Sequence, residues 1–347
     1  MTNSTPNEIP TEMRAWRWSS SGSPSEVLKL ETNLPICSPK PHEVLLKVHA
    51  TSINPVDSKN MKDNILHKLL KKPFTPCLDI VGTVVEIGKE STKFKIGDKV
   101  FGNLNPMKGG GLAEYCLSEE QFLVKAPEQL TDVELATFPL VSLTAWQGIV
   151  SKGQVKKGMR ILIHGGGGGV GTVSIQLAKY LGAYVICTCS SKKIELVRSL
   201  GADQVIDYTI EDVKKILKED KVDVVFDCVG GTEIYESSLE ILKTSGSFIT
   251  IVGDEPEIGG IGWLMKNGAR ILSRKTFSYF GYSNYIMFSG APVEEQLEEV
   301  SKLITEGALK PVIDSVYSFE QSVEAFEKQL SGHCSGKVIV QLSCGCT

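Results

Sequence analysis

The sequence lacks the features that mark several broad classes of protein. Its nine cysteines form no Cys-x-x-Cys pair, and their odd number argues against a disulfide framework. No basic run stands out among 37 Lys and Arg against 41 Asp and Glu, so nothing favours nucleic-acid binding. No apolar stretch approaches the ~20 residues that a membrane-spanning helix needs. We therefore expect an ordinary globular protein of the cytoplasm, with unpaired thiols and no nucleic-acid or membrane partner.

The two ends of the chain show no clear targeting or lipidation signal. The N-terminal residues are polar and lack both the apolar segment of a secretory signal and the arginines of a transit peptide, so residues 1–12 are expected to be a flexible tail. The last four residues, Cys344-Gly345-Cys346-Thr347, have the length of a prenylation box. Gly and Cys are poor substitutes for its aliphatic positions, which argues against lipid attachment.

The first third of the chain reads as β structure. Short apolar segments alternate with Pro and Gly, as at Glu43–Ser52, Asp79–Ile87 and Lys99–Phe101, which predicts an irregular β-barrel-like domain. The character changes at Thr131, which forms a capping box with Glu134 and predicts the start of a helix.

From Met159 onward, strand and helix patterns alternate. The predicted strands are 160–164, 184–188, 204–206, 222–227 and 247–252, and the predicted helices between them are 169–181, 192–200, 211–218 and 232–242. This alternation predicts a parallel, doubly wound sheet with ligands at the carboxyl ends of its strands. The Gly- and aromatic-rich segment 259–290 has no clear period, and we expect an edge strand near Ile271–Lys275.

A glycine-rich loop is the strongest functional signal. Gly166, Gly168 and Gly171 form G-x-G-x-x-G directly after the strand Ile161–His164 and before an amphipathic helix. In this setting the first Gly allows a tight turn, the second lets the backbone approach a pyrophosphate, and the third lets helix and strand pack closely. The loop therefore predicts a dinucleotide site, with His164 before it as a packed strand-end residue rather than a catalytic base.

The end of the second strand indicates which dinucleotide binds. An NAD site usually has an Asp or Glu about 20 residues beyond the loop for the adenine-ribose 2′-OH. Here the strand ends in Cys189 and is followed by Ser190, Ser191, Lys192 and Lys193. Hydroxyl and ammonium groups suit a 2′-phosphate, so NADPH is favoured over NADH.

The order of domains and a series of motifs resemble the medium-chain dehydrogenase/reductases, and within them the zinc-free quinone oxidoreductase and enone reductase branch. The resemblance covers about residues 13–341. Its motifs are Asn54-Pro55-Val56-Asp57, Asp79-Ile80-Val81-Gly82, Gly97–Gly102, Gly111–Tyr115, Leu143–Trp146, the glycine loop, Gly201-Ala202-Asp203, Asp207-Tyr208, Asp227–Gly230 and Gly336-Lys337-Val338.

The resemblance implies an α/β fold with two domains. A GroES-like β-barrel catalytic domain would span 13–138 and be completed by about 290–347, and a Rossmann domain that binds NADPH would span 139–289. The implied function is zinc-independent transfer of hydride from NADPH to an enone, enal or quinone. Two alternatives stay open: a dedicated enoyl reductase of a biosynthetic pathway, and a cofactor-binding interaction or scaffold protein without turnover.

The zinc-dependent alcohol dehydrogenases of the same family have metal ligands that this chain lacks. Asn54 stands where that branch has a catalytic Cys, and Leu78 stands where it has a His. A structural zinc site would need four closely spaced cysteines between about 100 and 120, and Cys116 is the one present. We therefore predict no metal.

The resemblance also implies which residues form the site. Asn54, Asp57 and Lys59 would border the nicotinamide: Asn54 would orient substrate or the nicotinamide amide, and Lys59 would hold the cofactor ribose or donate to a developing oxyanion. The alternative is that Asp57 and Lys59 form a solvated ion pair and Asn54 a turn. The cofactor would be held by Lys59 and by Thr144, Gly166, Gly168, Gly169, Val170, Gly171, Ser190, Ser191, Lys192, Lys193, Tyr208, Val252 and Gly253.

Two further expectations concern the segment beyond the Rossmann pattern. Phe277, Tyr279, Phe280, Tyr282 and Tyr285 could line a pocket for planar substrates or pack an interface. The predicted edge strand near Ile271–Lys275 could pair across a two-fold axis, which makes a homodimer a hypothesis.

Overall fold

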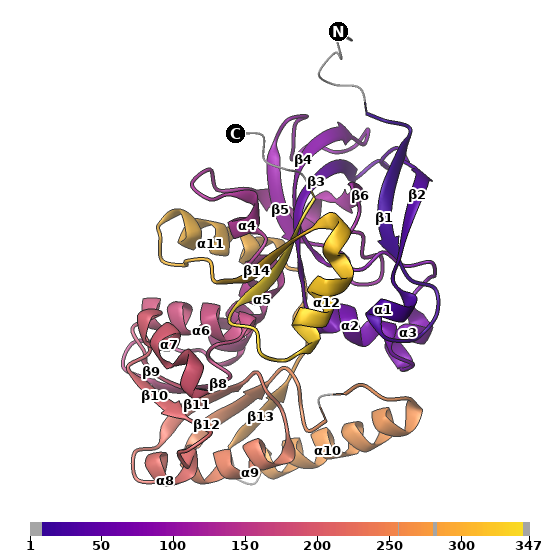
Figure 1. Cartoon of the computed structure of the whole chain (residues 1–347). Helices are drawn as coiled ribbons and strands as arrows, with labels where there is room; N and C mark the ends of the chain where they lie inside the picture. Colours follow the sequence, from indigo (N-terminus) through magenta and orange to yellow (C-terminus); the bar gives the residue numbers. More distant parts are fainter. Residues whose placement is uncertain (1–8, 256, 280–282, 343–347) are drawn as a thin grey trace.

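The computed structural model describes residues 9–255, 257–279 and 283–342. It contains a seven-stranded sheet and a six-stranded sheet, each in its own lobe, and a separate two-stranded ribbon (Figure 1). The fold is α/β, with a GroES-like domain and a Rossmann domain, as the sequence predicts. The chain visits the first lobe, crosses to the second and returns, so residues from both ends of the sequence build the first lobe.

The seven-stranded sheet is the framework of the GroES-like domain. Its order is β14-β15-β3-β4-β5-β7, with β6 also paired to β3. The strands are β3 (Glu43–Ile53), β4 (Asp79–Ile87), β5 (Lys99–Asn103), β6 (Tyr115–Glu119), β7 (Leu123–Lys125), β14 (Ile313–Ser318) and β15 (Lys337–Gln341). β3 is almost entirely buried because it pairs with β4, β6 and β15 and lies at the middle of the domain.

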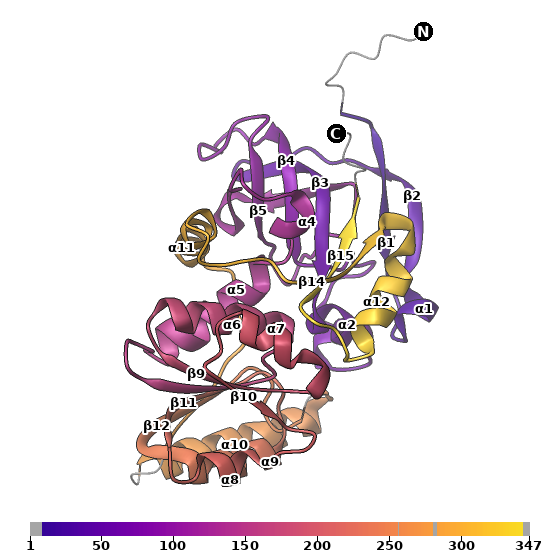
Figure 2. The ribbon, with the colours of Figure 1, turned by 60° about the vertical axis from the view of Figure 1, so that its left-hand side comes forward.

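Short elements close the ends of this domain. The ribbon consists of β1 (Glu12–Arg17) and β2 (Lys29–Pro35), and the helices are α1 (Pro24–Val27), α2 (Pro55–Met61), α3 (Ile65–Leu69) and α12 (Ser322–Leu330). The C-terminal helix α12 lies beside α2, although more than 250 residues separate them in sequence (Figure 2). A core that includes Trp18, Met61 and Phe326 fills the space between them.

The six-stranded sheet is parallel throughout, in the order β10-β9-β8-β11-β12-β13. Its strands are β8 (Arg160–His164), β9 (Tyr184–Cys189), β10 (Gln204–Asp207), β11 (Val222–Asp227), β12 (Leu242–Thr250) and β13 (Asn284–Met287). α6 (Gly169–Tyr180) and α7 (Ile194–Ser199) cover one face, and α8 (Val213–Leu217), α9 (Thr232–Ile241) and α10 (Ile261–Tyr279) cover the other (Figures 1 and 2). Helices on both faces explain why β8 and β11 are continuous apolar runs.

A helical connection joins the two lobes. The capping box at Thr131 is confirmed: Thr131 Oγ1 accepts a hydrogen bond from Glu134 N, and α4 (Asp132–Leu135) follows. α5 (Pro139–Trp146) then continues through a wider helical stretch to Lys152. This run, Asp132–Lys152, is long and apolar enough to cross a membrane by length and composition, which the sequence analysis did not anticipate. However, 72% of its most apolar window is buried inside the protein, as in the core helix of a soluble fold.

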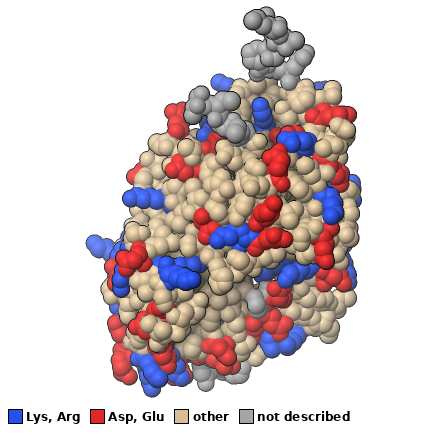
Figure 3. Space-filling view, viewed as in Figure 1, with Lys and Arg blue, Asp and Glu red and all other residues tan. Residues whose placement is uncertain are grey.

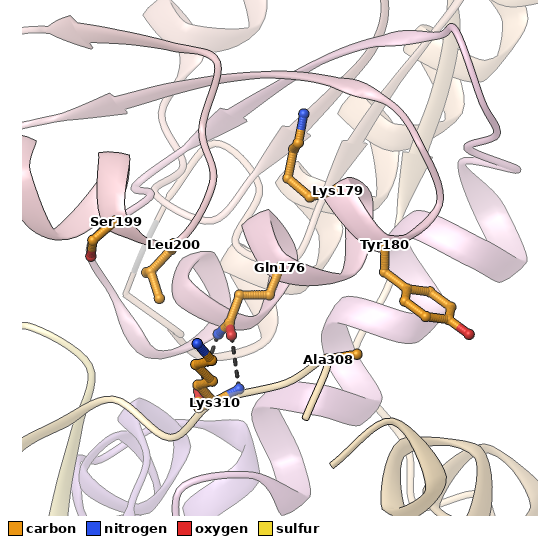
Figure 4. A pocket seen from close by; sticks show the side chains of 7 residues that line it. All are labelled: Gln176, Lys179, Tyr180, Ser199, Leu200, Ala308 and Lys310. Atoms are coloured by element: carbon orange, nitrogen blue, oxygen red, sulfur yellow. Dashed lines mark hydrogen bonds between the residues drawn. The ribbon is translucent and has the colours of Figure 1, made fainter. Parts of the chain in front are cut away.

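The chain returns to the first lobe through α11 (Glu294–Thr305). Gln176 on α6 holds this return segment, because its side-chain amide donates to Lys310 O and accepts from Lys310 N (Figure 4). A hollow of about 340 Å³ lies at this junction, and Lys179, Tyr180 and Leu200 are among the residues that line it. No predicted site residue lines this hollow.

The predicted edge strand near Ile271–Lys275 is wrong, because these residues lie inside α10. The helix is held by Arg274, which pairs with Asp254 and lies 3.6 Å over the ring of Tyr235. Glycines and aromatics obscured the helical period of this segment. β13 occupies the sheet edge instead, and the homodimer hypothesis loses the strand on which it was based.

Candidate cofactor and active site

The loop between β8 and α6 needs glycine at two of its predicted positions for steric reasons. A Cβ on Gly171 would lie 2.2 Å from Gly165 O, and a Cβ on Gly166 would lie 3.0 Å from the Cβ of Cys187 in β9. Gly168 differs, because the nearest atom to its Cβ position is 3.5 Å away, again Gly165 O. The loop is therefore tightly packed at Gly166 and Gly171 and has open space at Gly168, which is what a backbone needs in order to approach a phosphate.

The first turn of α6 completes this cradle. Its N-cap, Gly168, has no side chain that could bond the first N–H groups of the helix. Gly169 and Val170 begin the helix and are partly exposed. The first N–H groups of a helix have no partner within it, and its dipole favours an anion at this end. The loop residues present thus fit the pyrophosphate of a dinucleotide.

The adenosine end of the predicted site lies where β9 and β10 finish. Ser191 Oγ donates to the Asp207 carboxylate, which also accepts from Thr209 N at 3.0 Å, so this acid is occupied within the protein. These bonds lower the pKa of Asp207, with the Ser191 contact as the largest cause. Tyr208 follows and is 60% exposed, so it does not belong to the packed core.

The lysines at this end differ in their surroundings. Lys192 is exposed, whereas the stem of Lys193 lies across the loop, with its Cδ 2.5 Å from the position a Cβ would take on Gly167. Lys193 Nζ donates to Cys334 O at 2.6 Å. Ser190 is the partly exposed residue just before them. The two serines, both lysines and Tyr208 therefore follow the carboxyl ends of β9 and β10, and Lys193 reaches the glycine loop.

The predicted nicotinamide-side residues follow other strand and helix ends. Val252 and Gly253 come after β12, where their N–H groups donate to Thr250 Oγ1, and Gly253 has a φ of 78°. Thr144 on α5 is buried and donates through Oγ1 to Leu140 O. These residues lie at the carboxyl edge of the sheet, where ligands of doubly wound folds bind.

Two of the three predicted catalytic residues are buried. Asn54 is 1% exposed and Asp57 is 2% exposed. Asp57 accepts from Asn54 N at 2.8 Å, which stabilises the start of α2, and from Cys77 N at 3.0 Å, which joins α2 to the segment before β4. Burial, opposed by the Asn54 hydrogen bond and reinforced by Asp79, raises the pKa of Asp57 to about 7. Their polar atoms are therefore directed to protein partners, and their catalytic role stays a prediction.

Lys59 is in a different position. It lies on α2 beyond Asn54 and is partly exposed, and its Nζ makes no hydrogen bond or ion pair among the residues that the structure describes. The alternative of an Asp57–Lys59 ion pair is not formed, since Asp57 is occupied by backbone groups. Burial lowers the pKa of Lys59, with Glu257 opposing this and Lys62 adding to it.

Two buried charged residues that were not predicted as site residues lie beside Asn54. Asp79 begins β4 and Lys337 begins β15, and their side chains are 3.4 Å apart. Asn54 Nδ2 donates to Asp79 Oδ2 at 2.7 Å, and Asn54 Oδ1 accepts from Lys337 Nζ. Both residues belong to the family motifs that the sequence contains. The signal that could have found them is a charged side chain at the start of an otherwise buried strand.

His164 lies beneath the loop, 6% exposed, and its Nδ1 is 3.1 Å from Thr188 Oγ1. Burial lowers its pKa, with Asp227 opposing this. No group of three or more His, Cys, Asp and Glu that could hold a metal occurs among the described residues. Asn54 is committed to Asp79 and Lys337, and Leu78 is an apolar core residue, so neither replaces a zinc ligand.

Comparisons with known proteins agree with this geometry. Residues 40–128 match the alcohol dehydrogenase GroES-like domain, and residues 200–340 match the zinc-binding dehydrogenase domain. The 2-methylene-furan-3-one reductase of Solanum lycopersicum is 34% identical, across 97% of this chain and 81% of the relative. The chain belongs to the zinc-free quinone and enone oxidoreductase branch of the medium-chain dehydrogenase/reductases.

Other members of the medium-chain family support the same placement. The NADPH-dependent alkenal/one oxidoreductase of Arabidopsis thaliana is 33% identical across 96% of this chain and 80% of its own length. The solved quinone oxidoreductase of Coxiella burnetii superposes with a TM-score of 0.85 at 31% identity, covering 96% of this chain and all of that one. Membership makes the chain an oxidoreductase that uses a nicotinamide cofactor.

The aromatic residues proposed for substrate binding have only one described side chain. Tyr285 is 2% exposed and stacks with Phe248 at 5.9 Å, so it packs the core of the Rossmann domain and lines no pocket for a substrate. Phe280 and Tyr282 lie outside the described residues, as do the side chains of Phe277 and Tyr279 and the terminal Cys344 and Cys346.

Proposed function

We propose that this medium-chain reductase uses NADPH to reduce enones, enals or quinones. The observation that carries the cofactor choice is the end of β9, where Ser190, Lys192 and Lys193 follow Cys189. The nearest acid, Asp207, is occupied by Ser191 and Thr209. A ribose 2′-OH would find no free carboxylate among these described residues, whereas a 2′-phosphate would find two lysines.

The substrate class rests on the relatives. The tomato relative is a 2-methylene-furan-3-one reductase, the Arabidopsis relative is an alkenal/one oxidoreductase, and the Coxiella structure is a quinone oxidoreductase. When bound, NADPH supplies a hydride; the electrophilic carbon of an enone accepts it, and a proton from solvent completes the saturated carbonyl. Negative charge that develops on the substrate oxygen needs a hydrogen-bond donor.

Lys59 is the residue we assign to this oxygen or to the cofactor ribose. Its Nζ has no protein partner among the described residues, and it projects from the helix that Asn54 and Asp57 stabilise. Lys59→Met should therefore lower kcat/KM strongly. The matched control is Lys62→Met, three residues along the chain and 2.9 Å from Glu257, which should have little effect.

The direct test is NADPH oxidation with 1,2-naphthoquinone, 9,10-phenanthrenequinone and a series of small enones, with their saturated ketones as controls. We expect turnover of at least one conjugated acceptor, none of the saturated ketones, and weaker use of NADH. Tight NADPH binding with no turnover of any acceptor would refute the reductase and favour a scaffold protein. Equal use of NADH would refute the cofactor assignment alone.

We also propose the cellular compartment of the protein and the classes of partner that it lacks. The described cysteines are free thiols, most of them buried, which supports a reducing compartment such as the cytoplasm. Figure 3 shows Lys and Arg interspersed with Asp and Glu across one face, so a nucleic acid would find no continuous basic track there. A homodimer also remains a proposal.

A further inference from the structure

Lys337 is a buried ammonium group whose contacts divide between the two domains. It is 5% exposed, and its Nζ donates to Ile53 O at 3.1 Å and to Asn54 Oδ1, with Asp79 Oδ2 at 3.4 Å. An ammonium has three protons, and these three acceptors use all of them. All three acceptors belong to the GroES-like domain.

The stem of the same residue and the backbone of the preceding Gly336 face the glycine loop of the other domain. A Cβ on Gly169 would lie 2.9 Å from Lys337 Cδ. Gly336 N donates to Gly167 O at 3.1 Å, and Gly168 and Gly336 form a parallel bridge. Gly336 and the stem of Lys337 therefore lie against the loop backbone that, in the proposed function, approaches the cofactor phosphates.

The Asn54 amide is fixed in one orientation by this arrangement. Its Nδ2 faces the Asp79 carboxylate and its Oδ1 faces the Lys337 ammonium. Turning the amide over would set the NH2 group against an ammonium and the oxygen against a carboxylate. Asn54 is also the N-cap of α2, which carries Lys59.

Asp79 adds a second connection to the cofactor side. Its Oδ1 accepts from Leu140 N at 2.7 Å, in the helix α5 that carries Thr144. Its Oδ2 also accepts from Ser52 Oγ. Asp79 and Lys337 together thus join three elements: α2 with Lys59, α5 with Thr144, and the glycine loop.

We propose that Lys337 is a positioning residue that sets the glycine loop relative to α2. Held at one end by Asn54 and Asp79 and at the other by Gly169, it fixes the distance between the phosphate-binding backbone and Lys59. This rests on the proposed function, since it concerns the seat of the same cofactor. Loss of the ammonium lets the loop and α2 shift, and a misplacement of ~1 Å in a catalytic arrangement can cost about 100-fold in rate.

The test compares Lys337→Met with Lys310→Met, an exposed lysine on the same return segment. We expect Lys337→Met to raise KM for NADPH and NADH alike by about tenfold, to lower kcat by about tenfold, and to increase the primary isotope effect with NADPH deuterated at C4. Lys310→Met should change none of these. A merely structural role would lower the folded fraction, which reduces kcat but leaves KM and the isotope effect unchanged.

Lys337→Met leaves Asp79 buried without its partner and could unfold the protein. The double variant Asp79→Asn/Lys337→Met removes both charges together and keeps the test available; it should show the same change in KM and isotope effect. Gly169→Ala provides a second perturbation, because its methyl would press on the Lys337 stem. Its effect on NADPH affinity should be non-additive with that of Lys337→Met, as expected for residues in contact.

Two results would overturn the proposal. Folded Lys337→Met, or the folded double variant, with KM, kcat and isotope effect within twofold of the parent would do so. A loss of kcat alone, with KM and isotope effect unchanged, would leave Lys337 a structural residue. If the parent reduces no acceptor, the proposed function fails while NADPH affinity, measured by fluorescence, still tests Lys337.

Discussion

Two glycines of the loop, Gly168 and Gly171, should respond to the same methyl group in opposite ways. At Gly171 an added Cβ meets only backbone, with Gly165 O at 2.2 Å, Gly166 Cα at 2.8 Å and Gly165 C at 2.9 Å. At Gly168 the nearest atom is 3.5 Å away, and its φ of −89° and ψ of 173° are open to any residue. Alanine therefore disturbs the fold at Gly171 and only the ligand at Gly168.

The magnitudes follow from the contacts. Overpacking against atoms that cannot rotate away costs typically ~1–3 kcal/mol, more than the ~1 kcal/mol that Gly→Ala gains within a helix, so Gly171→Ala should destabilise the protein. Gly168→Ala should change stability by less than ~1 kcal/mol, because the gain of ~0.4–1 kcal/mol through the unfolded chain is offset by the poorer N-capping of Ala at the start of α6. A methyl that costs about tenfold in affinity would cut the stabilisation by NADPH from ~2.7 to ~1.4 kcal/mol, at a concentration of 100 times the parent Kd.

Chemical denaturation with and without NADPH, together with fluorescence titration, measures both quantities. Gly268→Ala is the control, because Gly268 is exposed in α10 with nothing within 4 Å of its Cβ position. It should gain slightly in stability and bind NADPH as the parent does. Wild-type NADPH affinity in Gly168→Ala would refute the assignment of this backbone to the pyrophosphate, and a fully stable Gly171→Ala would refute the packing argument.

Three further predictions follow from the side chains. Lys193→Ala should weaken NADPH binding by about 10- to 100-fold and leave NADH binding unchanged, since a hydrogen bond to a charged group contributes ~1.5–3 kcal/mol. Equal losses of affinity for both cofactors in titrations would contradict this. Asp57 has its folded pKa raised to about 7, so the folded state binds this proton more tightly than the unfolded chain, and its contribution to unfolding free energy should fall as pH rises from about 4 to about 7. Asp57→Asn should flatten that part of the stability profile. Hydrogen bonds from His49, the largest cause, and from Lys99 lower the pKa of Asp132 to about 2. The ionised Asp132 therefore stabilises the parent above about pH 4, and this contribution is lost as pH falls from about 4 to about 2. Asp132→Asn should lack this contribution at every pH, which acid titration of the circular dichroism signal measures.

The parts of the fold that sequence predicted correctly are those encoded locally. The loop at 165–171, the helix that follows it and the capping box at Thr131 each depend on residues a few positions apart. α10 was missed for the converse reason: what stabilises it is Arg274 against Asp254 and the ring of Tyr235, contacts made across 20 and 39 positions. No local period reports such contacts.

The burial of the predicted catalytic residues could not be predicted from the sequence. Asn54 and Asp57 are both buried, and Asp79 and Lys337 use the side-chain polar atoms of Asn54. Those partners lie 25 and 283 positions away. A motif names residue types at each position, but which side chain turns inward depends on the pairing of β3 with β4 and β15.

The boundary between the two domains is held unequally along its length. At one end Gly336 N donates to Gly167 O of the glycine loop, and Leu140 N at the start of α5 donates to the buried Asp79 carboxylate, which would lose this donor at a cost of ~1–3 kcal/mol if the domains separated there. At the other end the boundary is held by Lys62 and Glu257, an exposed ion pair worth ~0–1 kcal/mol, and by the hydrogen bond from Ile65 N to Gly259 O. Because the exposed contacts are the weaker ones, we infer that the domains part most readily at the α2–Glu257 end, while the glycine loop stays attached at Gly336.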